Sequence, residues 1–203
     1  MNYIIGIICK NYNNCIGYKN TNKLIFNISD ELKNFRKITS ETTLTHKKNI
    51  LLMGKNTWLS LPKPVLPNRV SCVITSNYLE YSKIYMNTLD IMFFGGIPQF
   101  LDYFRNNTTK YNNIFVIGGT SIYQYFYDNG LYNYLYISQI TSPNNFGDVY
   151  INFKNIENEY ECIHSEYYKN VLSKHTLDNQ DYYLDYNFSV YKNNNKQEFK
   201  FLN

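Results

Sequence analysis

Two adjacent carboxylates, Asp30 and Glu31, stand in a stretch whose spacing predicts a helix over about residues 28–38. Apolar side chains recur at helical intervals on the face of Glu31: Ile28, Leu32, Phe35 and Ile38. Asp30 falls on the polar face, where Asn27 is placed to cap the helix with Asp30 as its partner. Burial among apolar neighbours raises the pKa of a carboxyl, so Glu31 is the candidate acid of a pocket. The alternative is a glutamate at the edge of the apolar stripe that reaches water.

Two glycine-containing turns each join a predicted buried strand to a predicted helix. Gly118-Gly119 precedes a helix over 120–130, and Gly54 precedes a short helix that starts near Asn56 or Thr57. Glycine lets a backbone approach a ligand closely, and a helix N-terminus favours an anion such as a pyrophosphate. Lys55 beside the second turn suits the added phosphate monoester that separates NADPH from NADH. The alternatives are tight turns without a ligand and a solvated lysine.

Arg69 follows a connection that holds three of the five prolines. A planar guanidinium is a natural partner for a substrate carboxylate. An ion pair with a surface acid is the alternative at this position.

Short apolar runs predict strands at 3–9, 49–54, 69–76, 91–96 and 113–119. Helical spacing follows the last two of these runs, at 97–106 and 120–130. Three further strands, at 131–140, 160–168 and 181–191, have no helices between them and predict an antiparallel end to the sheet. The pattern indicates a mainly parallel α/β sheet, whose ligands bind at the carboxyl ends of the strands.

The composition excludes several classes of protein. The net charge is +4, but lysines and arginines are scattered along the chain and form no dense basic run, so no nucleic-acid partner is required. The apolar N-terminal run is too short to span a membrane, and no membrane partner is expected. The cysteines lack metal-ligand spacing and suit a reducing compartment, which favours a cytoplasmic protein without a metal: Cys9, Cys15, Cys72 and Cys162.

Seven short motifs occur together and in order: "IGY", "FNISDELKNF", "MGKNTW", "LPNR", "VIGGTSIY", "YISQI" and "GDVY". The set resembles dihydrofolate reductase over essentially residues 3–191. The resemblance implies an α/β domain over 1–192 with a central eight-stranded, mostly parallel sheet, an antiparallel C-terminal edge and helices on both faces. It also implies reduction of 7,8-dihydrofolate to tetrahydrofolate with NADPH, and antifolate inhibitors as ligands.

The resemblance assigns roles residue by residue. Glu31 matches the family's active-site acid, which anchors the pterin and supports protonation at ring nitrogen five, and Ser138 matches the hydroxyl that bonds this acid. The implied substrate site comprises Ile7, Ile8, Glu31, Phe35, Leu61, Leu66, Arg69, Ile117 and Tyr123. The implied cofactor site comprises Cys9, Ile16, Gly17, Gly54, Lys55, Asn56, Thr57, Thr75, Ser76, Gly118, Gly119, Thr120, Ser121, Ile122 and Tyr123.

The chain departs from the family pattern at three places. Ile25-Phe26 stands where the family usually has Pro-Trp, and the loop before it is longer than usual. Ser138 replaces a threonine and keeps its hydroxyl. Thr75 and Ser76 lack the arginine often found there, so the preference for NADPH rests mainly on Lys55.

Two questions stay open. The stretch "QEFKFLN" at the end of the tail 193–203 resembles the opening of thymidylate synthase, so the chain is either the reductase part of a fused protein or ends in a disordered tail. The activity is dihydrofolate reduction, a related pterin or pyrimidine reduction, or binding of folate or nucleotide without catalysis. Arg69 favours folate, because the other reductase substrates lack its glutamate tail.

Overall fold

A computed structural model describes residues 2–43, 46–141, 147–154 and 156–195. The strands are β1 Ile4–Asn11, β2 Cys15–Gly17, β3 Phe26–Ile28, β4 Lys48–Gly54, β5 Arg69–Ile74, β6 Ile91–Phe94, β7 Tyr111–Gly118, β8 Tyr134–Thr141, β9 Val149–Tyr150, β10 Tyr160–His175 and β11 Asp181–Asn193. The helices are α1 Ser29–Ser40, α2 Lys55–Ser60, α3 Tyr78–Ile84, α4 Ile97–Arg105, α5 Thr120–Asp128 and α6 Ile156–Glu159.

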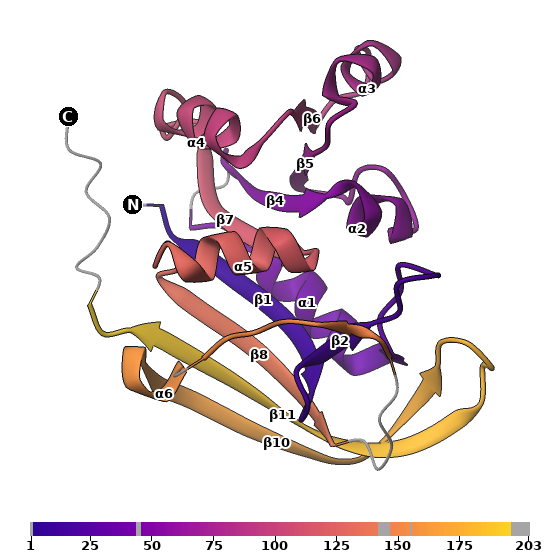
Figure 1. Cartoon of the computed structure of the whole chain (residues 1–203). Helices are drawn as coiled ribbons and strands as arrows, with labels where there is room; N and C mark the ends of the chain where they lie inside the picture. Colours follow the sequence, from indigo (N-terminus) through magenta and orange to yellow (C-terminus); the bar gives the residue numbers. More distant parts are fainter. Residues whose placement is uncertain (1, 44–45, 142–146, 155, 196–203) are drawn as a thin grey trace.

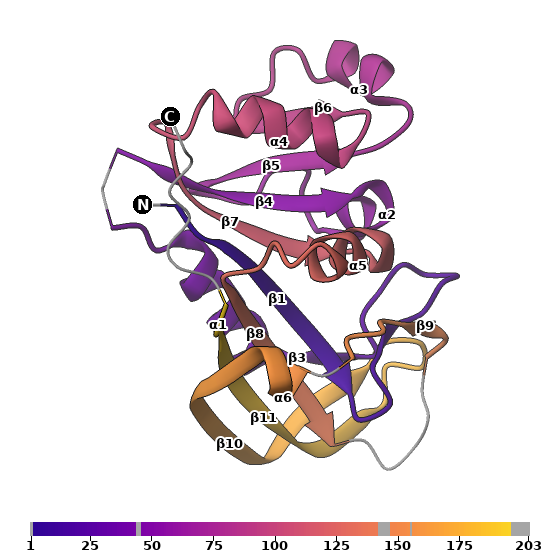
Figure 2. The same cartoon turned by 60° about the vertical axis from the view of Figure 1, so that its left-hand side comes forward.

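Among the described residues, the main sheet has nine strands in the order β3-β10-β11-β8-β1-β7-β4-β5-β6 (Figure 1). The six strands from β8 to β6 run parallel, whereas β11, β10 and β3 pair antiparallel. Figure 2 shows β6 and α3 at the opposite end of the molecule from the β10–β11 hairpin. A separate two-stranded sheet joins β2 and β9.

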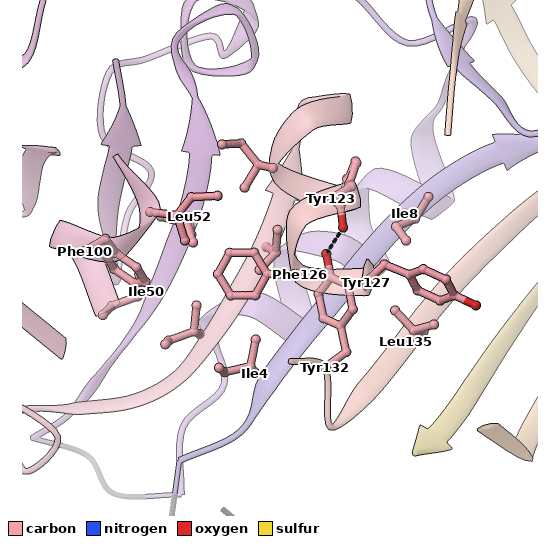
Figure 3. Packing of buried hydrophobic residues seen from close by; sticks show 14 of the residues in the cluster. Ile4, Ile8, Ile50, Leu52, Phe100, Tyr123, Phe126, Tyr127, Tyr132 and Leu135 are labelled. Atoms are coloured by element: carbon pink, nitrogen blue, oxygen red, sulfur yellow. Dashed lines mark hydrogen bonds between the residues drawn. The ribbon is translucent and has the colours of Figure 1, made fainter. Parts of the chain in front are cut away.

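Helices cover both faces of the parallel part, because its strands are apolar on both sides. In β1, Ile4 and Ile8 join the core under α4 and α5, while Ile5 and Ile7 join the core under α1 and α2. Figure 3 shows the first core, where the Tyr132 hydroxyl donates to the Tyr123 carbonyl at 3.2 Å. Because side chains of β1 point to both faces of the sheet, the carboxyl end of this strand lies between α1 on one face and α5 on the other.

Trp58, the one tryptophan of the chain, belongs to the second core. Its ring lies edge-on to Tyr81, Tyr85 and Phe93, with ring centroids 5.3–5.5 Å apart, and its Nε1 donates to the Pro64 carbonyl at 3.0 Å. These contacts tie α2 to α3 and to the connection that precedes β5. The side chain is only 4% exposed.

The α/β fold is confirmed, with three differences in detail. The main sheet gains a ninth strand, β3, because residues 26–28 pair with Ser173–His175 before α1 begins. The strand predicted at 131–140 is β8, which is parallel to β1, so the antiparallel edge begins only at β11. Helix α3 was not predicted; it is seven residues long and buries no residue, although Tyr78 and Tyr81 pack against the second core.

The predicted cap of the opening helix is wrong. Asn27 lies exposed in β3, Ile28 occupies the N-cap position of α1, and no side chain caps the helix. The pairing of β3 with β10 extends the backbone through Ile28 and moves the start of the helix to Ser29. Asp30 instead forms an exposed ion pair with Lys33 at 2.8 Å.

Helix α5 ends at Asp128, and Gly130 stands directly after its C-cap residue, Asn129. Gly130 has φ +57°, and Leu131 N–H donates to the Phe126 carbonyl at 2.8 Å. Of the tail, residues 193–195 are described, with Asn193 ending β11, and the "QEFKFLN" prediction at 197–203 lies outside the described residues.

Candidate active site

A cavity of about 540 Å³ opens at the carboxyl ends of β1 and β7. One part of its lining, which we call the framework wall, comes from helices and strands or the turns joining them: Ile7, Ile8, Cys9, Glu31, Leu32, Phe35, Asn56, Thr57, Ser60, Leu61, Ile117, Gly118, Gly119, Thr120 and Tyr123. The other part, which we call the loop wall, comes from residues near β2 and β9: Ile16, Gly17, Tyr18, Lys19, Asn22, Lys23, Leu24, Asp148, Val149 and Tyr150. The site therefore lies where open α/β sheets bind ligands.

Glu31 enters the framework wall from the first turn of α1. The residue is 8% exposed, and Ser138 Oγ donates to its Oε1 at 3.0 Å. Ser138 reaches this position because its strand, β8, pairs it directly with Cys9 of β1. Within the described residues, no lysine, arginine or histidine forms an ion pair with Glu31.

Burial governs the protonation of this acid. Desolvation raises the pKa of Glu31, and the hydrogen bond from Ser138 opposes part of that rise. Burial likewise raises the pKa of the Cys9 thiol and of the Tyr123 hydroxyl, and the nearby Glu31 charge adds to both shifts. The arrangement favours a carboxyl that holds its proton to higher pH than an exposed glutamate does.

The glycine turn after β7 approaches α2 closely. Gly118 has φ +131°, and a Cβ there would lie 2.9 Å from Thr57 Oγ1, so only glycine fits. The Gly118–Gly119 peptide bond is cis. Thr120 begins α5 immediately afterwards, and the first turn of this helix presents backbone N–H groups. This side-chain-free cradle at a helix N-terminus fits the pyrophosphate of a dinucleotide.

Hydrogen bonds join the two parts of the loop wall, the segment after β2 and the segment around β9. Asp148 Oδ1 accepts from Lys19 N–H at 2.7 Å, and Asp148 N–H donates to the Gly17 carbonyl at 3.1 Å. A Cβ on Gly17 would lie 2.3 Å from the Lys23 carbonyl oxygen, which requires glycine at this position. Tyr18 and Asp148 lie within the motifs "IGY" and "GDVY", but neither residue was predicted to belong to the site.

Arg69 does not line the cavity. The side chain is buried, with Nε donating to the Pro67 carbonyl at 3.0 Å and Nη1 to Thr39 Oγ1 at 2.9 Å. Burial, and then the charge of Arg36, lower the pKa of Arg69. Leu66 also lies outside the lining and packs against the second core. Their predicted contacts with substrate stay predictions.

Several predicted cofactor residues stand beside the cavity rather than in its lining. Gly54 and Lys55 directly precede Asn56 of the lining, and Ser121 and Ile122 follow Thr120. Thr75 is buried just after the end of β5, and Ser76 is exposed. Leu32, which the helix period places beside Glu31, is 42% exposed and faces the cavity rather than the core.

A family model described as dihydrofolate reductase matches residues 3–192. The chain belongs to this family. It is 30% identical to a dihydrofolate reductase of Candida albicans over 130 residues, which is 63% of this chain and 62% of the relative. It is also 30% identical to the dihydrofolate reductase of Saccharomyces cerevisiae over 124 residues, 59% of this chain and 57% of the relative. The chain thus spans about three fifths of the length of these two relatives.

Fusion proteins and a solved structure extend the comparison. A bifunctional dihydrofolate reductase-thymidylate synthase of Plasmodium berghei is 31% identical over 101 residues, 48% of this chain and 17% of that protein. A dihydrofolate reductase from Enterococcus faecalis, complexed with NADP(H) and RAB-propyl, superposes with a TM-score of 0.69 at 20% identity. The match covers 95% of this chain and 97% of that one, and it shows the dihydrofolate reductase fold.

Proposed function

We propose that this chain catalyses the NADPH-dependent reduction of 7,8-dihydrofolate to tetrahydrofolate. The observation that carries the proposal is the buried Glu31 carboxyl, which faces an apolar cavity and accepts a hydrogen bond from Ser138. It stands in a chain of the dihydrofolate reductase family, on the helix where a substrate acid was predicted.

Glu31 binds the amino-pyrimidine edge of the pterin and supports protonation at ring nitrogen five. Its raised pKa suits this task, because a general acid works best when its pKa lies close to the working pH. Ser138 orients the carboxyl by donating to Oε1, and Phe35 lies one helical turn away as an apolar neighbour. Together these contacts hold the acid against the ring and keep water from it.

When bound, NADPH would supply the hydride for the carbon next to nitrogen five. Ile117 and Tyr123 would border both rings, and the Tyr123 hydroxyl is fixed by donating to the Ile7 carbonyl at 2.7 Å. The cofactor is held by a first-loop group of Cys9, Ile16 and Gly17, by a pyrophosphate turn of Gly118, Gly119, Thr120, Ser121 and Ile122, and by an adenosine-phosphate group of Gly54, Lys55, Asn56, Thr57, Thr75 and Ser76.

The folate body packs on Ile7, Ile8, Leu61 and Leu66, and Arg69 binds the α-carboxylate of its glutamate. A guanidinium has five donor N–H groups, and the contacts to Pro67 and Thr39 use two of them. Those contacts hold the side chain in place while further donors remain for a carboxylate. Antifolate inhibitors occupy the same space.

Turnover assays test the proposal. We expect the chain to oxidise NADPH only when dihydrofolate is added, and Glu31→Gln to lower kcat/KM by about 10²–10⁴-fold. Asp30→Asn is the matched control, because Asp30 is exposed and paired with Lys33. Intact NADPH binding without turnover would indicate a binding module, and turnover of another pterin or a pyrimidine would indicate a related reductase. Equal losses of kcat/KM in the two variants would contradict the assignment of Glu31 as the active-site acid.

Lys55 tests the choice of cofactor. Because it stands at the start of α2 beside Asn56 and Thr57 of the cavity, we propose that it reads the added phosphate of NADPH. Lys55→Ala is expected to weaken NADPH binding much more than NADH binding in a fluorescence titration. Lys169→Ala on β10 is the control, and a uniform loss for both cofactors contradicts the assignment.

We also propose that the native protein carries a thymidylate synthase domain after this chain and works in the cytoplasm. Support for the fusion comes from bifunctional relatives in Plasmodium berghei and Paramecium tetraurelia. Four free cysteines support a reducing compartment. A stop codon after Asn203 in the native gene would contradict the fusion, and a fluorescent fusion of the full chain found in an organelle would contradict the location. Within the described residues, no helix combines the length and apolar character that crossing a membrane requires.

A further inference from the structure

The turn of the β10–β11 hairpin contacts the loop wall of the cavity. His175, at the end of β10, is 4% exposed, and its Nε2 lies 2.7 Å from the Tyr18 hydroxyl. Its Nδ1 lies 2.9 Å from Asp178 Oδ1. Figure 2 shows the indigo loop after β2 and the orange and yellow hairpin turn at the same end of the sheet. A chain of polar contacts therefore runs from Asp178 through His175 to a residue that lines the cavity.

A second contact holds the far end of the same loop. Thr176 N–H donates to the Ile25 carbonyl at 3.0 Å, and Thr176 Oγ1 donates to the Leu24 carbonyl at 2.6 Å. Within the loop, Tyr18 N–H donates to the Lys23 carbonyl at 3.0 Å. Because Tyr18, Lys23 and Leu24 all line the cavity, the hairpin turn fixes both ends of the segment that covers it.

Three aromatic side chains also pack around the His175 imidazole. Its ring contacts those of Phe26, Tyr182 and Tyr18, with centroids 5.5–5.9 Å away. Asp178 is itself fixed, because its Oδ1 accepts from Gln180 N–H at 3.0 Å, and this bond together with His175 lowers the pKa of Asp178. In the tautomer that carries its proton on Nδ1, Nε2 accepts a hydrogen bond from the Tyr18 hydroxyl, and Nδ1 faces Asp178 Oδ1.

We propose that His175 is a positioning residue that, through Tyr18, holds the loop wall over the bound cofactor. The inference rests on the proposed function for the identity of that cofactor. Loops that cover an active site exclude water and set the rate of ligand release. Loss of the His175–Tyr18 contact should therefore speed the release of NADPH and expose the cavity more often. The position and protonation of Glu31 should not change.

Two substitutions of the same residue separate positioning from packing. His175→Gln keeps an amide nitrogen where Nε2 stands and can donate to Tyr18, whereas His175→Asn reaches only the Asp178 side. We expect Tyr18→Phe and His175→Asn to speed NADPH dissociation by about threefold to tenfold, as the loss of one hydrogen bond predicts, and His175→Gln to restore most of it. Tyr12→Phe, at a tyrosine that is 62% exposed, is the control.

The measurements are stopped-flow NADPH release, the split between kcat and KM, and amide hydrogen exchange of residues 17–25 without any ligand. The inference predicts faster exchange in this segment for Tyr18→Phe and His175→Asn, and no larger effect in the double variant than in either single one. Unchanged exchange, equal effects in Tyr12→Phe, or no recovery in His175→Gln would overturn it. Because exchange needs neither cofactor nor turnover, it decides the positioning role even if the proposed reductase activity fails.

Discussion

The two walls of the cavity are built in different ways. The framework wall places Glu31, Thr57 and Gly118 on helices and strand ends, whose backbones are fixed by sheet ladders and helical bonds. The part of the loop wall from Gly17 to Leu24 is fixed largely by other segments, by Asp148 on one side and by the β10–β11 turn on the other. The residues proposed to take part in the chemistry therefore lie on rigid elements. Ligand access depends on a segment that can move when a few contacts break.

This difference has an energetic basis. Rearranging the framework wall would disrupt buried strands whose side chains fill two cores, such as Ile8, Leu52 and Phe115. Moving the loop wall would break hydrogen bonds that contribute about 0.5–1.5 kcal/mol each. Substitutions in the framework wall should change stability or chemistry, whereas those in the loop wall should change ligand exchange.

The largest expected effect on stability is at Gly118. An added Cβ would lie 2.9 Å from Thr57 Oγ1, and φ +131° is a conformation that side chains rarely adopt. We expect Gly118→Ala to lower the free energy of unfolding by about 1–3 kcal/mol and to weaken NADPH binding at the same time. Chemical denaturation and a cofactor titration measure the two effects.

Gly96→Ala is the control for this change, because Gly96 has φ −170° and an added Cβ would meet Pro98 Cδ at 3.6 Å. A loss of similar size in both variants would show that the glycine turn of the framework wall has no special requirement.

The next effect is at the acid. Ser138→Ala removes the donor to Glu31, and since that hydrogen bond favours the charged carboxylate, the pKa of Glu31 should rise further. The fall of kcat/KM with rising pH should therefore move to higher pH. Ser138→Thr keeps the hydroxyl and should leave the profile near that of the parent; an unshifted profile in the alanine variant speaks against the contact.

A smaller effect is expected on the loop wall. Asp148→Ala removes the acceptor of Lys19 N–H and should speed NADPH release by about threefold to tenfold. The melting temperature should change little, because the contact holds a loop rather than a core. A large loss of stability without a change in release would break the comparison between the two walls.

The smallest effect concerns stability. Burial raises the pKa of Glu31 above its unfolded value, so between those two values the folded state binds more protons and stability falls as the pH rises. Glu31→Gln removes that penalty and should melt slightly higher than the parent at neutral pH. The difference should vanish in acid, below the ordinary glutamate pKa of about 4.3, where both side chains are neutral. Thermal melts across this range are the measurement.

Local patterns predicted two features of the framework wall, and most of its other predicted lining residues came from the resemblance. The helical repeat alone separated Glu31 from Asp30, and glycines next to buried strands marked the turn at Gly118. Such patterns can be recognised in a sequence because each depends on residues within one helical turn or one strand of each other. The resemblance added Ser138, which no local pattern connects with an acid 107 residues away.

The loop wall could not be predicted in this way. Tyr18 and His175 are 157 residues apart in the chain, and neither stands in a repeat or motif that points to the other. Strand β3 is three residues long and acquires its pairing only from β10, so it was not predicted, and its last residue, Ile28, was assigned to the opening helix. The contacts of Arg69 within the protein were also not predicted, because its residue type indicates a carboxylate partner and says nothing of Pro67 and Thr39, which hold the side chain in place.

Trp58 gives this protein an internal optical reporter. It is the only indole in a chain with 22 tyrosines, it is shielded from solvent, and it stands on α2 directly after Thr57 of the cavity. Its emission should be blue-shifted, and NADPH bound in the cavity should quench it by resonance energy transfer. Occupancy of the site can therefore be followed without a label or a substitution, in the same cuvette that records turnover.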